Sequence, residues 1–346
     1  MIAYAVDPDI TAASTLPGSF YRDAAAFAAA RERVFARTWQ WIGDLADVTA
    51  PESLSPRTAL PGILDEPLLL ARDAQGVLRC LSNVCTHRGN ILVKTPCQAK
   101  QIRCGYHSRR FDLAGRMTFM PEFKEARSFP SPSDDLPSVP FGDWAELGFA
   151  CVQPVAPLAD FIGDMTRRLA ALPSDRMRYD AGRSRDYVVH AHWALYVENY
   201  LEGFHIPFVH PGLNQVVDYA AYASELFRYS NVQVARTRDG EPAAQYWWIF
   251  PNLMLNFYPW GLSLNFVQPQ APDRTLVSFR SYVWDPSQLD AGAGSSLDRV
   301  EEEDEAIVQA VQRGVRSRFY TRGRYSPTRE RGVHHFHRLL CEFLAK

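Results

Sequence analysis

The sequence predicts an α+β protein made of two parts, each built around antiparallel strands. Between about residues 45 and 155, short apolar runs alternate with Pro, Gly, Asp and Ser, a texture typical of short antiparallel strands. After residue 155, helical stretches and longer strand-like runs follow one another. A chain of 346 residues is long enough for both parts to bury a core of their own.

The elements are expected in the following order. Apolar positions at helical spacing predict a helix over 21–44, and a second helix is expected at 158–172. Residues 185–205 predict a strand that continues into a helix. The remaining expected elements are strands near 227–236, 244–250, 253–258, 262–268 and 275–284, a loop of small residues at 285–296, and helices at 297–319 and 330–344.

Bulk properties exclude several classes of protein. The net charge is only −2 and no long Lys/Arg run occurs, so nothing favours nucleic-acid binding. No stretch approaches the roughly 20 uncharged apolar residues that span a bilayer. The N-terminus lacks the basic start and apolar core of a secretory signal. We therefore expect a cytoplasmic protein that binds neither nucleic acid nor a membrane.

Six cysteines are too few for a disulfide scaffold in a chain of this length. Four of them, Cys80, Cys97, Cys151 and Cys341, have no histidine close by. We expect these four to be reduced thiols that pack as small apolar groups. A disulfide between Cys80 and Cys97 is the alternative.

The other two cysteines begin two similar motifs, "CTHRGN" and "CGYHSRRFDLAGR". Cys85 and His87 are followed after sixteen residues by Cys104 and His107. Two thiolates and two imidazoles suit either tetrahedral zinc or an iron–sulfur cluster. Zinc fingers usually pair Cys with Cys and His with His along the chain, whereas here each motif supplies one of each. That arrangement favours a [2Fe–2S] cluster in which one iron takes both cysteines and the other both histidines.

A second candidate metal site lies in "ENYLEGFHIPFVHPGL". Glu202 and His205 are three residues apart and project from nearly the same helix face. His205 and His210 would be about 140° apart on a regular helix. Pro207 lies between them and disfavours a regular helix, so a break there would let both imidazoles face one metal. The alternative is that both histidines are packed core residues.

The helix expected at 297–319 contains five consecutive acids. On a projection with ~100° per residue, Asp304 falls in the middle of the stripe of Val and Ile side chains. Glu301, Glu302 and Glu305 point elsewhere, and Glu303 lies at the margin of the stripe. We expect these glutamates to form a solvated face. A lone carboxylate on a buried face needs a partner, and a bound metal would supply one to Asp304.

Other histidines are expected to have structural or surface roles. His190 and His192 fall on one face of an expected strand, and "HHFH" (334–337) falls in the expected C-terminal helix. We assign no metal to either group. The aromatic residues of 245–266 are expected to be mostly core, with a few lining a substrate pocket.

Both metal motifs resemble those of the Rieske non-heme iron oxygenases, alpha subunit. "CTHRGN…CGYHSRRFDLAGR" is similar to the Rieske motif, and the pattern N-x-x-E/D-x-x-H-x-x-x-x-H that begins at Asn199 is similar to the mononuclear iron motif. The resemblance covers most of the chain. It implies an all-β Rieske [2Fe–2S] domain at 45–155 and a helix-grip (START-like) catalytic domain with an antiparallel sheet at 156–346. Residues 1–44 would be an N-terminal helical segment that packs on the catalytic domain.

The resemblance also implies the cofactors and their ligands. Cys85, His87, Cys104 and His107 would hold the [2Fe–2S] cluster, and His205, His210 and Asp304 a mononuclear Fe(II). The reaction would use O2 and electrons that NAD(P)H supplies through a separate reductase, with or without a ferredoxin.

Glu202 is implied to join His107 of one subunit to His205 of the next, so the functional unit would be a ring, a homotrimer. Two positions depart from the usual pattern of the family. Many members carry glycine where this chain has Ser108, and most familiar members carry aspartate where it has Glu202.

Phrases such as "HPGLNQVVDY", "NFYPWGLSLNFVQP" and "SPTRERGVHHFHRLL" resemble the choline/glycine-betaine monooxygenase-like branch. This implies monooxygenation or oxidative N-demethylation of a small organic substrate, with an aromatic cage suited to a quaternary ammonium. An aromatic-ring hydroxylating dioxygenase of aromatic hydrocarbon catabolism is the alternative. Two hypotheses from other classes are a Rieske electron-transfer protein without oxygenase chemistry and a lipid- or hormone-binding module.

Overall fold

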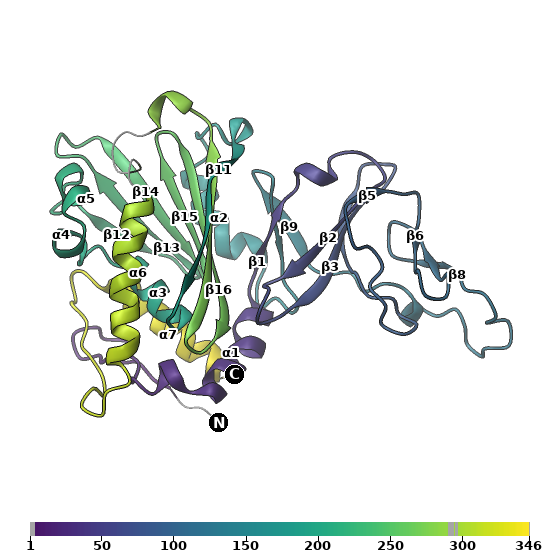
Figure 1. Ribbon diagram of the computed structural model, residues 1–346, viewed down its shortest axis with the longest axis horizontal. Coiled ribbons are helices and arrows are strands. Elements are labelled where there is room, and N and C mark those ends of the chain that lie inside the picture. Colours follow the sequence, from purple (N-terminus) through teal and green to yellow (C-terminus); the bar gives the residue numbers. More distant parts are fainter. Residues whose placement is uncertain (1–3, 290–293, 295–296, 346) are drawn as a thin grey trace. The chain divides into compact units, whose positions relative to one another are not determined.

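The computed structural model describes residues 4–289, 294 and 297–345, and it divides the chain into two compact units. The larger unit combines the N-terminal segment up to Phe35 with everything from Ala156 onward, and the smaller unit comprises Ala36–Val155. Figure 1 shows the antiparallel sheets of each unit. The predicted α+β class is therefore confirmed.

The smaller unit is built from three small antiparallel sheets. Their strand orders are β1-β10-β9, β4-β3-β2-β5 and β6-β7-β8. The strands are β1 (Gln40–Asp44), β2 (Ser53–Ala59), β3 (Glu66–Arg72), β4 (Leu78–Ser82), β5 (Cys97–Gln98), β6 (Ile102–Arg103), β7 (Arg110–Phe111), β8 (Met117–Phe119), β9 (Phe141–Trp144) and β10 (Leu147–Ala150). Short 3-10 turns lie at Ala46–Val48 and Pro132–Asp134.

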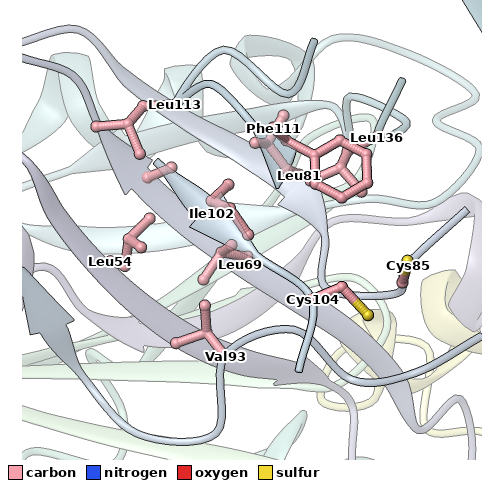
Figure 2. Close-up of a cluster of buried hydrophobic side chains, with 11 residues drawn as sticks. Leu54, Leu69, Leu81, Cys85, Val93, Ile102, Cys104, Phe111, Leu113 and Leu136 are labelled. Atoms are coloured by element: carbon pink, nitrogen blue, oxygen red, sulfur yellow. The ribbon is translucent and has the colours of Figure 1, made fainter. Parts of the chain in front are cut away.

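A cluster of buried side chains joins the second and third of these sheets. Figure 2 shows the cluster, with the sulfur-bearing side chains of Cys85 and Cys104 on the same side of it. The other labelled members are Leu54, Leu69, Leu81, Val93, Ile102, Phe111, Leu113 and Leu136. Burying each of these large apolar side chains stabilises the fold by roughly 1.5–3 kcal/mol. The same apolar contacts fix the two loops that carry the cysteines.

The larger unit contains one seven-stranded antiparallel sheet, in the order β11-β17-β16-β15-β14-β13-β12. Its strands are β11 (Arg178–Val189), β12 (Ala223–Leu226), β13 (Ser230–Arg236), β14 (Pro242–Ile249), β15 (Leu253–Tyr258), β16 (Gly261–Ala271) and β17 (Arg274–Val283). The helices are α1 (Ala24–Arg33), α2 (Leu158–Arg168), α3 (Trp193–Tyr200), α4 (Ile206–Val209), α5 (Pro211–Val216), α6 (Leu297–Gly314) and α7 (Arg331–Ala345). The long helix α6 runs alongside the sheet (Figure 1), and α3 contacts α6, α7 and β16. None of the helices within the described ranges is long and apolar enough to cross a bilayer.

The strands predicted from 227 to 284 correspond to β13–β17, and the predicted helices at 158–172, 297–319 and 330–344 correspond to α2, α6 and α7. In the loop predicted at 285–296, residues 290–293, 295 and 296 lie outside the described residues. The helix predicted over 21–44 differs from the structure in its second half.

The helix predicted over 21–44 is wrong after Arg33. Asp23 caps α1 by accepting hydrogen bonds from the backbone N–H groups of Ala25 and Ala26. A 3-10 turn follows α1, and the chain then becomes strand β1, which pairs antiparallel with β10. Pairing with a distant strand therefore overrides the helical spacing of the apolar residues.

All six cysteines are free thiols. Cys80 on β4 and Cys97 on β5 are separated by two intervening strands of the same sheet, too far apart for a disulfide. Cys80 and Cys151 are buried and Cys341 is half-buried, but Cys97 is exposed. The expectation of a packed thiol is therefore wrong for Cys97.

Candidate metal centres

The two Cys/His motifs form loops with the same backbone hydrogen bonds. In each loop the cysteine N–H donates to the carbonyl five residues later, and the cysteine carbonyl accepts from the N–H four residues later. The four bonds are Cys85 N to Asn90 O (2.9 Å), Gly89 N to Cys85 O (2.9 Å), Cys104 N to Arg109 O (2.8 Å) and Ser108 N to Cys104 O (3.1 Å). The matching backbones place the two cysteines at equivalent positions, while the histidine is the second residue after the cysteine in one loop and the third in the other.

Ser108 and Gly89 occupy the same position in these loops, and both have positive φ. The φ angle is 70° at Gly89 and 60° at Ser108. Glycine adopts this left-handed conformation at no steric cost, whereas serine is strained there. This explains why glycine suits the position of Ser108 in the Rieske motif.

The four side chains are placed to bind a metal cluster. Cys85 and Cys104 are each only 2% exposed, and the ring centroids of His87 and His107 are 4.8 Å apart. Nδ1 of His107 is buried and has no hydrogen-bond partner among the described residues. An unpaired buried nitrogen is unfavourable, and coordination to a metal would satisfy it. Two sulfurs and two imidazole nitrogens at this spot fit a [2Fe–2S] cluster.

Neighbouring groups support the second loop. Cys104 Sγ accepts hydrogen bonds from Asn90 Nδ2 (3.6 Å) and from the backbone N–H of Tyr106 (3.5 Å). Hydrogen bonds to sulfur are one means by which a protein tunes a cluster's reduction potential. The guanidinium of Arg109 is 2% exposed and forms an ion pair with Asp134. This pair fixes the backbone directly after His107.

The second candidate centre brings together His205, His210 and Asp304. The nearest ligand atoms of these three residues all lie within 4.8 Å of one another. Asp304 Oδ1 is 3.0 Å from His210 Nε2 and 3.5 Å from His205 Nε2. The short helix α4 lies between the two histidines and includes Pro207, with His205 directly before it and His210 directly after it. The break predicted at Pro207 is therefore wrong, because proline is tolerated in the first turn of a helix. The two imidazoles face Asp304 from the two ends of α4 instead.

A carboxylate stands behind each of these two imidazoles. Glu202 Oε1 is 2.7 Å from His205 Nδ1, and Glu303 Oε2 is 2.7 Å from His210 Nδ1. A carboxylate on one ring nitrogen fixes the tautomer, so each histidine presents Nε2 toward Asp304. This is the donor set expected for a facial two-histidine, one-carboxylate Fe(II) site. Sequence reasoning missed Glu303, because its contact with His210 depends on how α6 packs.

Asn199, the first residue of the second motif, also contacts this centre. Its Nδ2 donates a hydrogen bond of 2.7 Å to Asp304 Oδ1. Asn199 lies near the end of α3, while Asp304 lies in the middle of α6. The contact between these two helices therefore positions the carboxylate.

The buried face of α6 differs from the predicted one. Ile307 and Val311 were expected to be buried with Asp304, but they are 40% and 42% exposed. The buried positions include Glu301 and Gln312, which are 5% and 3% exposed. The expectation that Glu301 belongs to a solvated face is therefore wrong. Asp304 lies at the edge of the buried face, with a side chain that is 17% exposed.

Polar contacts on and beside α3 add to the burial of Val308 and Val315 in orienting α6. The hydroxyl of Tyr196 lies 2.9 and 2.8 Å from the two carboxylate oxygens of Glu301. Gln312 Oε1 accepts a 2.9 Å hydrogen bond from the backbone N–H of His192. Burial, followed by the nearby charge of Asp304, raises the pKa of Glu301 well above its usual range.

A cavity of about 770 Å³, including its mouth, adjoins the second centre. His205, His210 and Asp304 contribute to its wall, so a metal held there would face the cavity. Five tyrosines line it as well, and these are Tyr196, Tyr200, Tyr222, Tyr246 and Tyr258. Tyr200 hydrogen-bonds Asn256 Oδ1 at 2.8 Å, and Tyr246 meets Tyr258 edge to face. The aromatic walls are thus held by contacts within the sheet and between α3 and the sheet.

Three of the five other histidines make structural contacts. His192 caps α3, with Nδ1 accepting a 3.2 Å hydrogen bond from Ala194 N. Burial lowers the pKa of His192 to about 3. His334 Nε2 lies 2.7 Å from the carbonyl of Asp7, and His337 Nδ1 lies 2.5 Å from the hydroxyl of Tyr325.

Comparisons with known proteins match both parts of the chain. Residues 38–130 match the Rieske [2Fe-2S] domain, and residues 176–346 match the ring hydroxylating alpha subunit catalytic domain. The predicted architecture, a Rieske domain plus a catalytic domain with helices and antiparallel sheet, is thereby confirmed. The match of the first domain also decides between zinc and an iron–sulfur cluster in favour of the cluster.

Two relatives align with nearly the whole chain. The chloroplastic choline monooxygenase of Arabidopsis thaliana is 29% identical over 95% of this chain and 82% of its own length. The carnitine monooxygenase oxygenase subunit of Escherichia coli is 29% identical over 95% of this chain and 93% of its own length. These relatives agree with the branch to which the sequence phrases pointed.

Solved structures share the fold. A quaternary ammonium Rieske monooxygenase in complex with L-carnitine superposes with a TM-score of 0.78 at 24% identity and 97% coverage of both chains. A naphthalene 1,2-dioxygenase with indole bound superposes with a TM-score of 0.73 at 17% identity, covering 96% of this chain and 92% of that one.

Proposed function

The chain belongs to the Rieske non-heme iron oxygenases, and from that premise we propose that it monooxygenates or oxidatively N-demethylates a quaternary ammonium compound. As an oxidoreductase of this family it uses a [2Fe–2S] cluster, a mononuclear iron and O2. Its electrons come from a reductase, which we propose draws them from NAD(P)H, with or without a ferredoxin.

The single observation that carries the substrate proposal is the tyrosine-lined cavity beside His205, His210 and Asp304. Aromatic faces attract a quaternary ammonium group through cation–π contacts, and desolvation in a pocket strengthens the attraction. The cavity wall also carries carboxylates, which favour a cation further. The relatives that match most of the chain are named for choline and carnitine, both of which carry such a group.

We propose that the ligands are those predicted from the sequence. Cys85, His87, Cys104 and His107 would hold the cluster, and His205, His210 and Asp304 would hold the iron. When bound, that iron supplies the site at which O2 is activated for insertion into the substrate. The chain's own residues position it: Glu202 and Glu303 fix the imidazoles, and Asn199 fixes the carboxylate.

Glu202 has a second proposed role, as the bridge between His205 and His107 of a neighbouring copy in a homotrimer. Large exposed aromatic side chains lie at both proposed ends of the bridge. Tyr106 is 59% exposed beside His107, and Phe204 and Phe208 on either side of His205 are 42% and 78% exposed. A neighbouring copy would cover them, which supports this assembly. Location in the cytoplasm stays a prediction.

The alternatives are less favoured. The pure electron carrier and the lipid- or hormone-binding module do not account for the match of 176–346 to an oxygenase catalytic domain. Aromatic hydrocarbon catabolism was predicted as a possible role, but it is not supported. The relatives at 29% identity are choline and carnitine monooxygenases, while the likeness to naphthalene dioxygenase at 17% identity shows only the fold.

A substrate panel with a surrogate reductase tests the proposal. The panel contains choline, carnitine, glycine betaine and naphthalene, and both product and hydrogen peroxide are measured. Product from at least one quaternary amine, with oxygen uptake matched by product, is expected. Oxidation of naphthalene alone, or peroxide as the sole outcome with every amine, would contradict it.

A further inference from the structure

Glu301 is a buried carboxylate that no role described so far uses. It lies on α6 three residues before Asp304, is 5% exposed and borders the cavity. Its only hydrogen-bond partner given by the described structure is the hydroxyl of Tyr196, which is buried as well. One hydroxyl proton cannot satisfy two carboxylate oxygens, so Glu301 retains acceptor capacity toward the cavity. A buried carboxylate in this position needs a further partner.

The charges around the cavity restrict what that partner can be. Glu202, Glu301 and Asp304 all contribute to its wall. The described residues that line it include no lysine and no arginine. Two of the three carboxylates have other partners, since Asp304 faces the candidate iron and Glu202 pairs with His205. Glu301 has no cationic partner among the lining residues, so in its ionised form it would need a positive charge that the ligand can supply.

The charged residues that line the cavity also restrict the rest of the ligand. A carboxylate on the substrate would enter a cavity whose wall holds carboxylates and no cationic side chain. Its only ionic partner would be the candidate iron, whose open positions are needed for O2, so a carboxylate is disfavoured there. A hydroxyl group, in contrast, would find amide and hydroxyl partners such as Asn256, Ser263 and Asn265, which line the cavity.

We propose that Glu301, held by Tyr196, is the counter-charge of the substrate's cationic nitrogen, and that the substrates are organic cations without a carboxylate. This inference rests on the proposed function and narrows it, within quaternary amines, to choline-like cations rather than betaines. Burial raises the pKa of the empty site's carboxyl, and a cation against it would favour the ionised form again.

Binding measurements under anaerobic conditions separate charge recognition from turnover. Isothermal titration of the holoenzyme would compare choline, its uncharged isostere 3,3-dimethyl-1-butanol, and zwitterionic glycine betaine. Choline should bind at least about tenfold more tightly than either of the other two. In Glu301→Gln, choline should lose about that factor while the isostere binds as before. Glu302→Gln, a change at an exposed glutamate on the same helix, is the matched control and should alter neither.

Each result has a definite meaning. Equal affinity for choline and its isostere, or equal losses for both in Glu301→Gln, would overturn the inference, the latter because it would show a packing role only. Glu301→Asp, which keeps the charge, should retain a preference for choline. If glycine betaine or carnitine is bound and oxidised while choline is not, the inference falls and the proposed function stands. If no quaternary amine is bound or oxidised, both fall.

Discussion

The two metal centres are built in different ways. The cluster loops lie close together in the sequence, and matching backbone hydrogen bonds place the cysteine and histidine of each. The iron centre takes two histidines that flank the short helix α4 and an aspartate that lies 94 residues beyond His210, on α6. The first centre is therefore fixed by local loop geometry, while the second depends on tertiary packing between α3 and α6.

Because of this difference, some substitutions should act on one centre only, while others should act on a centre that they do not touch. Changes in the cluster loops should remove one cofactor and leave the other, because the cluster ligands lie within Ala36–Val155 and the iron ligands within the larger unit. Changes on α6 should alter the iron centre even at residues that would not touch the metal, because they move or reorient its ligands.

The largest effect is expected from Cys104→Ala. The loss of one thiolate ligand should abolish the visible spectrum of the cluster and reduce turnover by about a thousandfold or more. The mononuclear iron should remain, at about one per chain, because its ligands lie in the other unit. Absorbance and iron analysis check this, and Cys97→Ala, which removes an exposed thiol, is the control. A retained cluster spectrum in Cys104→Ala would contradict the assignment.

Glu202→Gln should lower turnover by about 10–100-fold without removing either cofactor. Glutamine keeps the size of the side chain but loses the charge that pairs with His205 Nδ1. Rapid mixing of the reduced enzyme with O2 and substrate would show a cluster that reoxidises slowly. Unchanged reoxidation would argue against a bridging role, and Glu202→Asp should retain most of the rate.

Glu303→Gln tests the contact that the sequence did not reveal. Without the carboxylate charge of Glu303 beside Nδ1 of His210, this histidine becomes a weaker iron ligand. The affinity for iron should therefore fall by about 10–100-fold. Titration of the iron-depleted enzyme with Fe(II) measures this. Glu302→Gln changes an exposed neighbour and should bind iron as the unaltered protein does; equal affinities in both variants would show that Glu303 is dispensable.

The smallest effect concerns His192, which caps the helix that carries Asn199. Burial lowers its pKa to about 3 in the folded state, well below about 6.5 in the unfolded chain. The neutral form is therefore favoured by folding, and its stabilisation is present above pH ~6.5 and lost as the pH falls toward 3. His192→Asn keeps a capping side chain without this titration. Between pH 7.5 and 5.5, the melting temperature of His192→Asn should fall less than that of the unaltered protein. Equal falls in the two proteins would show that His192 does not contribute to this pH dependence.

The same contrast explains what the sequence could predict. The cluster ligands follow from a motif that specifies its own loops, and most strands of the larger sheet follow from their apolar runs. Asp304 was predicted from an apolar stripe that the structure buries only in part, since Val308 and Val315 are buried but Ile307 and Val311 are exposed. Glu301 and Gln312 are buried as well, through polar partners on and beside α3. Such partners are distant in the sequence, so projection of one helix cannot reveal them. Glu303 and Glu301 were missed as site residues for that reason.

The iron content of Asp304→Ala tests the assignment of the mononuclear centre directly. Each chain should hold about three irons, two in the cluster and one at the mononuclear centre. Asp304→Ala should contain about two, with the visible spectrum of the cluster unchanged and turnover abolished, while Glu302→Ala should keep all three. Three irons and normal turnover in Asp304→Ala would contradict the assignment of the iron to His205, His210 and Asp304.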